Sequence, residues 1–298
     1  MSAISPSGEQ VELSFGEQRA VIVGVGGGLR AYSVGDRPVL DGYRADEMCS
    51  SGRGQLLIPW PNRVEDGRYE FAGRGHQLAL DEPERRNAIH GLVRWSRWSV
   101  TEQEPERAVL EHLLYPTPGY PFTLALRVGY SLSEEGLTVR IEATNAGPEP
   151  CPYGAGAHPY LAVEGDDVDG LELRVPAGTV LQSNERAIPV GKAPVEGSEL
   201  DFREPKPIGS ARLDHCFTDL DRDSDGRAGA QLGGGTMLWV DESYPYLMVF
   251  TGDGLPDVER RSLAVEPMTC APNAFRSGNG LISLEPGETH TGTWGISP

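Results

Sequence analysis

The stretch 124-LALRVGYSLSEEGLTVRIEA-143 decides the fold. Large apolar side chains occupy every second position from Leu124 to Leu132 and again from Leu137 to Ala143. Because successive side chains of a β-strand point to opposite faces, this alternation gives each strand one apolar face. Residues 133–136, Ser-Glu-Glu-Gly, supply the polar turn between them. The stretch therefore predicts an antiparallel β-hairpin with one buried face.

Short apolar runs recur on both sides of this hairpin, separated by turn residues. Glycine (38) and proline (24) are more frequent than average usage predicts, so helix-length stretches free of both are scarce. The longest, residues 210–225, is dominated by charge and has no apolar stripe at helical spacing. Many short strands with such turns are typical of a β-sandwich or barrel. The runs are Val11–Phe15, Ala20–Val23, Leu29–Val34, Leu171–Val175, Met237–Val240 and Tyr246–Thr251.

The organisation of the chain is predicted to be simple. No repeat of fixed period and no Ser/Pro-rich linker interrupts it, so residues 1–298 are predicted to form a single domain, with residues 196–207 as a long polar loop. The first ten residues lack a cationic and apolar leader pattern, and no window approaches the length of a membrane span. We expect a cytoplasmic protein with its four separated cysteines reduced.

Charge excludes two classes of partner. The chain has 26 Lys and Arg against 44 Asp and Glu, which gives a formal net charge of −18. Nucleic-acid binding requires clustered cations that displace counterions from phosphates, and attachment to anionic membranes requires a basic face. We therefore expect neither nucleic acid nor membrane as a partner.

Three local patterns resemble ligand-binding motifs, but the residues around each of them do not fit the motif. In residues 24–28, Gly-Val-Gly-Gly-Gly, the third glycine of a dinucleotide loop would fall on Leu29, and a strand follows where a helix should begin, so a hairpin turn is favoured. The run from Asp221 to Gly226 opens like an EF-hand, but its twelfth position is Leu232, which favours an acidic surface turn. No His-x-x-x-His pair marks a zinc site, although a metal held by distant positions, as in cupin-like barrels, stays open.

Four other segments place polar side chains next to prolines, small residues or strand ends. Two prolines in 57-LIPWPNR-63 stiffen a loop that presents Arg63, and 87-NAIHGL-92 places His90 in a short apolar run. Small residues in 154-GAGAHPYL-161 precede His158 and predict room for a ligand. In 263-LAVEPMT-269, Glu266 is a lone carboxylate at the end of an apolar strand. Two imidazoles, a carboxylate and a guanidinium suit acid/base chemistry on a polyol.

These segments, in this order, resemble the aldose 1-epimerase (galactose mutarotase) family. The resemblance also includes 66-DGRYEF-71 and 214-DHCF-217, and it extends from about Gly28 to Trp294. It is strongest to the bacterial branch with the Pro-Trp-Pro-Asn-Arg motif. The fold that it implies is a large antiparallel β-sandwich with a sugar cleft across one face. The activity that it implies is interconversion of the α and β anomers of a hexose.

The resemblance also implies roles for individual residues. His158 matches the general acid, Glu266 the general base and His90 a second catalytic imidazole. The implied substrate-binding residues are Arg63, Asp214, Asn62 and Tyr160, with Asp219 and Asp221 as alternatives to Asp214. No cofactor and no metal enter this scheme. The chain departs from many members at Gly91-Leu92, where they have two glycines, and at residues 161–163, Leu-Ala-Val, where they have Phe-Asn-Leu; both departures are expected to bear on the preferred sugar.

The expected partner is a monosaccharide, bound by a monomer or a homodimer. An epimerase for an anionic hexose, a 6-phosphate or 6-sulfonate, is the alternative enzyme, and Arg53, Arg63 and Arg94 are its candidate cations. A non-catalytic sugar-binding module would not need the acid and base. A glycosidase normally requires paired carboxylates, and only Glu266 stands out.

Overall fold

The computed structural model describes residues 4–163, 165, 167–233, 235–256 and 258–298. Within these residues it is almost entirely β, with one short helix, α1 (Ala274–Ser277). Each of the six predicted apolar runs overlaps a strand. The prediction of a large antiparallel all-β fold is confirmed, and no described helix is long and apolar enough to cross a membrane.

The predicted hairpin forms as expected. Strand β12 (Leu124–Ser133) pairs antiparallel with β13 (Gly136–Asn145), and the register brings Ser133 opposite Gly136, so only two glutamates form the loop. The apolar positions of β12 are buried along its whole length. The two-residue spacing of the sequence thus sets both the register and the face that packs on the core.

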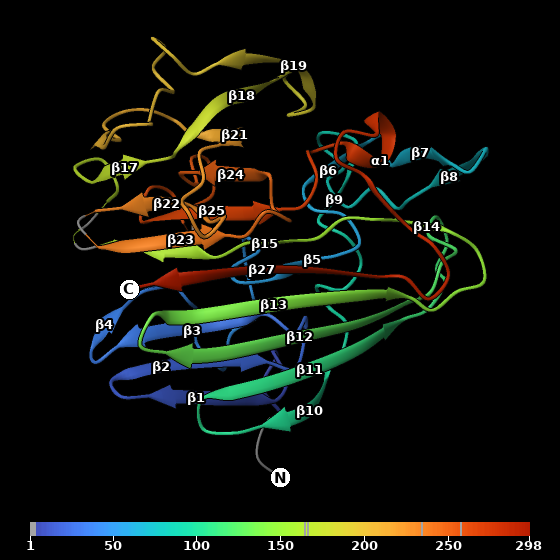
Figure 1. The fold of residues 1–298 in the computed structure, drawn as a ribbon, viewed down its shortest axis with the longest axis horizontal. Coiled ribbons are helices and arrows are strands. Elements are labelled where there is room, and N and C mark those ends of the chain that lie inside the picture. Colours follow the sequence, from blue (N-terminus) through green and yellow to red (C-terminus); the bar gives the residue numbers. More distant parts are fainter. Residues whose placement is uncertain (1–3, 164, 166, 234, 257) are drawn as a thin grey trace.

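The hairpin lies within a nine-stranded sheet that crosses the molecule (Figure 1). Its strands, in spatial order, are β10 (Ser99–Gln103), β11 (Arg107–Leu114), β12, β13, β27 (Thr289–Ser297), β23 (Thr236–Val240), β22 (Ala228–Leu232), β17 (Glu172–Arg174) and β20 (Lys206–Pro207). A four-stranded sheet contacts β11 and β12 through its first strand. It contains β1 (Gln10–Phe15), β2 (Gln18–Val23), β3 (Leu29–Val34) and β4 (Arg37–Pro38).

An eight-stranded sheet provides the most deeply buried strands. Its strands are β19 (Pro189–Pro194), β18 (Ala177–Ser183), β21 (Asp214–Leu220), β24 (Tyr246–Phe250), β25 (Ser262–Met268), β15 (Gly156–Ala157) and β5 (Leu56–Leu57), with β16 (Tyr160–Ala162) also paired to β25. Three strand pairs complete the described fold: β6 (Arg63–Glu65) with β9 (Asn87–Ile89), β7 (Arg68–Phe71) with β8 (Arg74–Gln77), and β14 (Cys151–Tyr153) with β26 (Ile282–Leu284).

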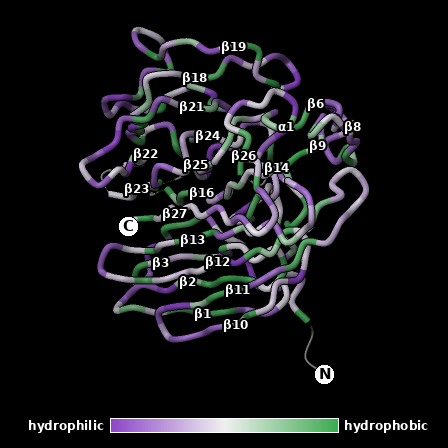
Figure 2. The backbone as a smooth tube through the Cα atoms, turned by 45° about the vertical axis from the view of Figure 1, so that its right-hand side comes forward, coloured by the Kyte–Doolittle hydropathy of each residue, from purple (hydrophilic) through white to green (hydrophobic). Residues whose placement is uncertain are grey.

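One cluster of buried apolar side chains includes residues from Val11 to Ile296. Figure 2 shows hydrophobic colour along β11 and hydrophilic colour in the connection between β10 and β11. This continuous core supports the proposal that residues 1–298 are a single domain. Residues 24–28 join the antiparallel strands β2 and β3, so they form the predicted hairpin connection. In the predicted acidic turn the Asp223 carboxylate accepts hydrogen bonds from the backbone N–H groups of Asp225 and of Arg227, which follows the turn.

Candidate active site

Glu266 lies within β25, buried among apolar residues. All seven residues of this strand are buried, and it is paired on both edges, with β24 along one and with β15 and β16 along the other. Glu266 therefore lies within a paired strand, with its side chain in the cavity lining, and the prediction that it stands at the end of a strand is wrong. Glu266 is 2% exposed, and its Oε2 atom has no hydrogen-bond partner among the described residues. A buried polar atom without a partner is rare in a stable fold and is suited to receive a ligand hydroxyl.

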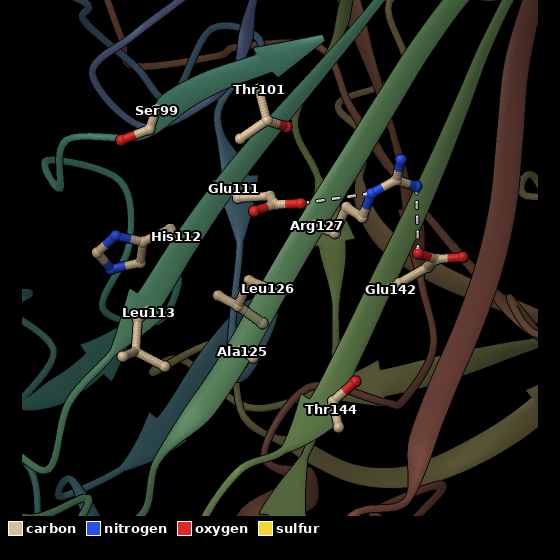
Figure 3. A pocket seen from close by; sticks show the side chains of 10 residues that line it. All are labelled: Ser99, Thr101, Glu111, His112, Leu113, Ala125, Leu126, Arg127, Glu142 and Thr144. Carbon is tan, nitrogen blue, oxygen red and sulfur yellow. Dashed lines mark hydrogen bonds and ion pairs between the residues drawn. The ribbon is translucent and has the colours of Figure 1, made fainter.

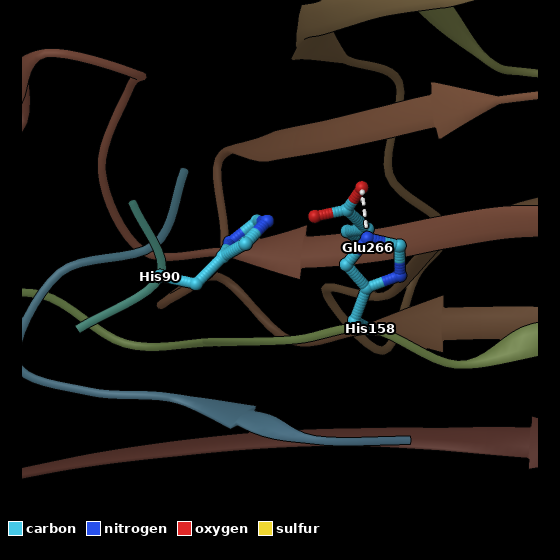
Figure 4. Close-up of side chains that lie close together, drawn as sticks. All are labelled: His90, His158 and Glu266. Atoms are coloured by element: carbon cyan, nitrogen blue, oxygen red, sulfur yellow. Dashed lines mark ion pairs between the residues drawn. The ribbon is translucent and has the colours of Figure 1, made fainter. Parts of the chain in front are cut away.

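His158 faces Glu266 from the segment between β15 and β16 (Figure 4). Its Nε2 atom lies 3.3 Å from Oε1 of Glu266. The Tyr160 ring stacks on the imidazole with 4.9 Å between centroids, and the Tyr160 hydroxyl donates a hydrogen bond of 3.0 Å to the Ser51 carbonyl. Stacking on an anchored ring fixes the plane of the imidazole and directs Nε2 at the carboxylate.

The glycines before His158 serve packing and leave no room for a ligand, contrary to the sequence prediction. A Cβ atom on Gly154 would lie 2.5 Å from Sγ of Cys270, and one on Gly156 would lie 2.8 Å from the Pro267 carbonyl oxygen. Both positions require glycine because the segment packs directly against β25 and the residues that follow it. This close approach places His158 beside Glu266.

His90 follows β9 and adopts a left-handed backbone conformation, with φ 63°. Its backbone N–H donates to the Asn62 carbonyl at 2.9 Å, and its Nδ1 accepts from the Asn62 backbone N–H at 3.2 Å. Because Nδ1 is an acceptor, we assign the ring proton to Nε2, which leaves one donor for a ligand. The ring centroid is 5.4 Å from that of His158. Gly91 must be glycine, since a Cβ there would lie 2.1 Å from the Ile58 carbonyl oxygen.

Arg63 opens β6 and forms a two-pronged ion pair with Glu82. Its Nε lies 3.0 Å from Oε2 and its Nη2 lies 3.0 Å from Oε1 of that carboxylate. Sequence reasoning missed Glu82, because it belongs to a run of charged residues, 81-DEPERR-86, in which nothing distinguishes it. Only the pairing of β6 with β9 brings the two together.

A cavity of about 680 Å³ contains this group. All seven predicted site residues line it: Asn62, Arg63, His90, His158, Tyr160, Asp214 and Glu266. Asp219 and Asp221 are outside the lining, as are Arg53, Leu92 and residues 161–163. The two departures from the family pattern therefore lie in the surrounding structure. Arg94, Trp95 and Phe250 also line the cavity, and no sequence motif identified the last two.

Burial shifts the acid/base equilibria of the three central groups. It raises the pKa of Glu266 well above the usual carboxyl value, and Asp214 adds to this increase while Arg63 opposes it. Burial also lowers the pKa of His158 to about 3 and that of His90 well below its usual value. Between these limits the His158 and Glu266 pair holds one proton in total.

The same three residues offer possible metal ligands. One donor atom from each of His90, His158 and Glu266 lies within 4.8 Å of the others. Two imidazoles and a carboxylate form a donor set that zinc accepts. The scheme implied by the sequence uses these residues without an ion, and a chelation experiment distinguishes the two cases.

A second pocket, of about 460 Å³, lies on the outer surface of β10–β13 (Figure 3). Arg127 occupies its floor between Glu111 and Glu142, with nitrogen-to-oxygen distances of 3.6 and 3.5 Å. Its histidine, His112, contacts the Arg97 carbonyl through Nδ1. The charged groups of this pocket are already paired with one another, so it does not offer the unpartnered buried oxygen found beside His158.

Comparison with known proteins agrees with this geometry. The family model for aldose 1-epimerase matches residues 9–297. YihR of Escherichia coli K12, an uncharacterised protein, is 37% identical over 286 residues, which are 95% of this chain and 91% of YihR. Galactose mutarotase of Sus scrofa is 27% identical over 262 residues, 78% of this chain and 75% of that protein. The structure of a GalM/aldose epimerase homologue from C. elegans has a TM-score of 0.86 at 17% identity and covers 97% of this chain and 98% of its own, which shows the common fold. The chain belongs to the aldose 1-epimerase family, a family of sugar-epimerising enzymes.

Proposed function

We propose that this protein is a mutarotase that interconverts the α and β anomers of a hexose by acid/base ring opening and closure. The observation that supports this most directly is the contact of 3.3 Å between His158 and Glu266 in the cavity wall, where no described residue bonds to the second carboxylate oxygen. The two groups share one proton, so one can accept a proton from the sugar while the other donates one.

The reaction conserves protons at every step. Glu266, as carboxylate, removes the proton of the anomeric hydroxyl, and His158, as imidazolium, protonates the ring oxygen as its bond to C1 breaks. The product is the open-chain aldehyde. After rotation about the C1–C2 bond, the former ring oxygen attacks the other face of C1, and the two residues exchange roles. Each positioned proton transfer contributes about 10²- to 10⁴-fold to the rate.

His158 and Glu266 can hold their one proton in either of two positions. A neutral pair and a carboxylate–imidazolium pair differ only by the position of one proton along the contact between Nε2 and Oε1. Sugar hydroxyls, the Nε2–H donor of His90 and the guanidinium of Arg63 supply the hydrogen bonds that favour the charged pair. Asp214, which also lines the cavity, is the proposed acceptor for a sugar hydroxyl.

Polarimetry tests the function directly. A freshly dissolved pure anomer of galactose or glucose should reach its equilibrium rotation faster with the protein present, in proportion to protein concentration. The same final rotation is expected with and without protein, since a catalyst does not change the equilibrium. If the protein accelerates the change in rotation for none of the sugars tested, the proposal is contradicted and a non-catalytic sugar-binding module is favoured.

The charges of the cavity favour a neutral hexose. Four arginines line it against six carboxylates: Arg63, Arg85, Arg94 and Arg212 against Asp81, Glu82, Glu84, Asp214, Asp253 and Glu266. Arg63 is paired with Glu82, and Nη2 of Arg94 lies 2.9 Å from Asp81. An anionic substituent would enter a site whose cations already have partners and would lose hydration without full compensation.

One observation favours the alternative, an anionic hexose. Nε of Arg94 is buried and, in the part of the chain that the structure describes, has no hydrogen-bond partner; this residue lines the cavity. We expect a higher kcat/KM for galactose or glucose than for glucose 6-phosphate or a 6-sulfonated glucose. A reversed order that Arg94→Ala abolishes would assign the anionic sugar instead.

The rate should depend weakly on pH over a broad range. Because the pKa of His158 is lowered to about 3 and that of Glu266 is raised, the singly protonated pair persists between the two limits. We expect kcat/KM to be constant between these limits and to fall at alkaline pH, where the pair loses its remaining proton. A profile that declines on both sides of a narrow optimum near pH 5 would contradict this assignment.

Metal removal is expected to leave the rate unchanged. The proposed proton transfers use only side chains, so prolonged treatment with EDTA followed by buffer exchange should preserve kcat. Polarimetry before and after treatment measures this, with metal content checked by mass spectrometry. A large loss that one added divalent metal restores would show that His90, His158 and Glu266 hold an ion.

A further inference from the structure

We propose that Glu82 is a positioning residue that holds Arg63 so that one edge of its guanidinium faces the substrate. This inference rests on the proposed function, in which Arg63 binds a sugar oxygen. Both side chains line the cavity, and they are 10% (Arg63) and 18% (Glu82) exposed.

The ion pair fixes which guanidinium nitrogen remains available. Glu82 occupies Nε and Nη2 of Arg63 through contacts of 3.0 to 3.2 Å. The described contacts of Nη1 are limited to Oδ1 of Asn62, at 3.5 Å, which is a weak hydrogen bond. A planar guanidinium held at one edge cannot rotate, so the Nη1 donors keep a single direction.

Glu82 is itself fixed in place. Nδ2 of Asn87 donates to Oε2 of Glu82 at 2.8 Å, and the backbone N–H groups of these two residues donate to each other's carbonyl at 3.1 Å. Asn87 opens β9, which pairs with β6. Arg63 therefore lies in β6, Asn87, which holds Glu82, lies in β9, and His90 directly follows β9. The pairing of these two strands places substrate-binding and catalytic groups in a constant relative position.

Charge gives a second reason for a carboxylate at this place. A guanidinium buried without a partner would carry a large desolvation penalty. Glu82 offsets this cost on the edge that carries Nε and Nη2. A neutral amide at residue 82 would keep one acceptor oxygen for Arg63, but it would lose the second acceptor, which now contacts Nε, and could not balance the charge.

A double-mutant cycle tests whether Glu82 acts through Arg63. The variants are Glu82→Gln, Arg63→Gln and the double substitution, assayed by polarimetry. We expect Glu82→Gln to lower kcat/KM by about 10- to 100-fold in the wild-type background and by less than about twofold when Arg63 is already glutamine. An equal loss in both backgrounds, or no loss in the single variant, would overturn the inference.

Two further variants separate positioning from folding. Glu149→Gln breaks an Arg–Glu pair of similar geometry, with Arg74, on an exposed surface outside the cavity, and it should leave kcat/KM unchanged. If Glu82→Gln does not fold, Asn87→Ala removes the hydrogen bond from Asn87 to Glu82 while keeping the Glu82 charge. Asn87→Ala should lower kcat/KM by less than Glu82→Gln does, and this loss of kcat/KM should disappear in the Arg63→Gln background. A loss of kcat/KM that persists there would overturn the inference.

Crystal structures test the placement independently of activity. In Glu82→Gln the guanidinium of Arg63 should leave its wild-type position, and an unmoved guanidinium would overturn the inference. A wild-type protein that accelerates no mutarotation would contradict the proposed function alone, because the position of Arg63 is still measured in the crystal.

Discussion

Replacement of Glu266 by glutamine should lower kcat by at least about 100-fold while the protein remains folded. The amide has nearly the shape of the carboxylate but cannot accept a proton from the anomeric hydroxyl. Burial raises the pKa of Glu266, so the charged carboxylate is costly in this strand. A neutral amide removes that cost, and the thermal unfolding midpoint should be equal or higher. Polarimetry and differential scanning calorimetry measure the two quantities.

Glu142→Gln provides the matched control. Glu142 contacts Arg127 and Arg140 on the outer surface of the nine-stranded sheet and is not part of the cavity lining. The same change of a carboxylate to an amide should leave kcat unaffected there. Near wild-type mutarotation by folded Glu266→Gln would remove Glu266 from the chemistry, whatever the control shows.

The fold was predictable where a local pattern determines the structure. Alternation between Leu124 and Ala143 is enough to predict the central hairpin, because strand register and buried face follow from a period of two. The assembly of the strands into sheets was not predictable in this way. β27, from the end of the chain, pairs with both β13 and β23, and no local pattern determines a contact over such sequence distances.

The site was predictable where the motif itself contains the functional residue. His90, His158 and Glu266 each lie in a short recognisable segment, and the structure brings all three to one cavity. The supporting contacts were not predictable. Glu82 is one acid among several in an exposed-looking stretch, and its pairing with Arg63 depends on the approach of two strands.

The position of Glu266 shows the limit of pattern reasoning more sharply. A glutamate before Pro267 has the sequence features of a strand end exposed to solvent. The residue is nevertheless inside a strand with paired neighbours on both sides. The buried position has a functional rationale, since a carboxylate in water would keep its usual pKa and would not share a proton with a neighbouring imidazole.

Replacement of His158 by asparagine should also lower kcat by at least about 100-fold. Asparagine keeps a polar group near Oε1 of Glu266, but it has no titratable nitrogen to protonate the ring oxygen. Polarimetry measures the effect. His112→Asn, on the outer surface of β11, is the matched control and should leave the rate unchanged. A folded His158→Asn variant with wild-type kcat would exclude this imidazole as the acid.

The double variant His158→Asn/Glu266→Gln tests whether the two residues act as one unit. If they exchange a single proton with the sugar, loss of either partner already prevents the exchange, and the second substitution has little left to remove. We therefore expect the double variant to be within about tenfold of the slower single variant, not slower by the product of the two losses. Multiplicative losses would mean that each residue acts separately, and the shared proton inferred from their buried contact would then not be the basis of the reaction.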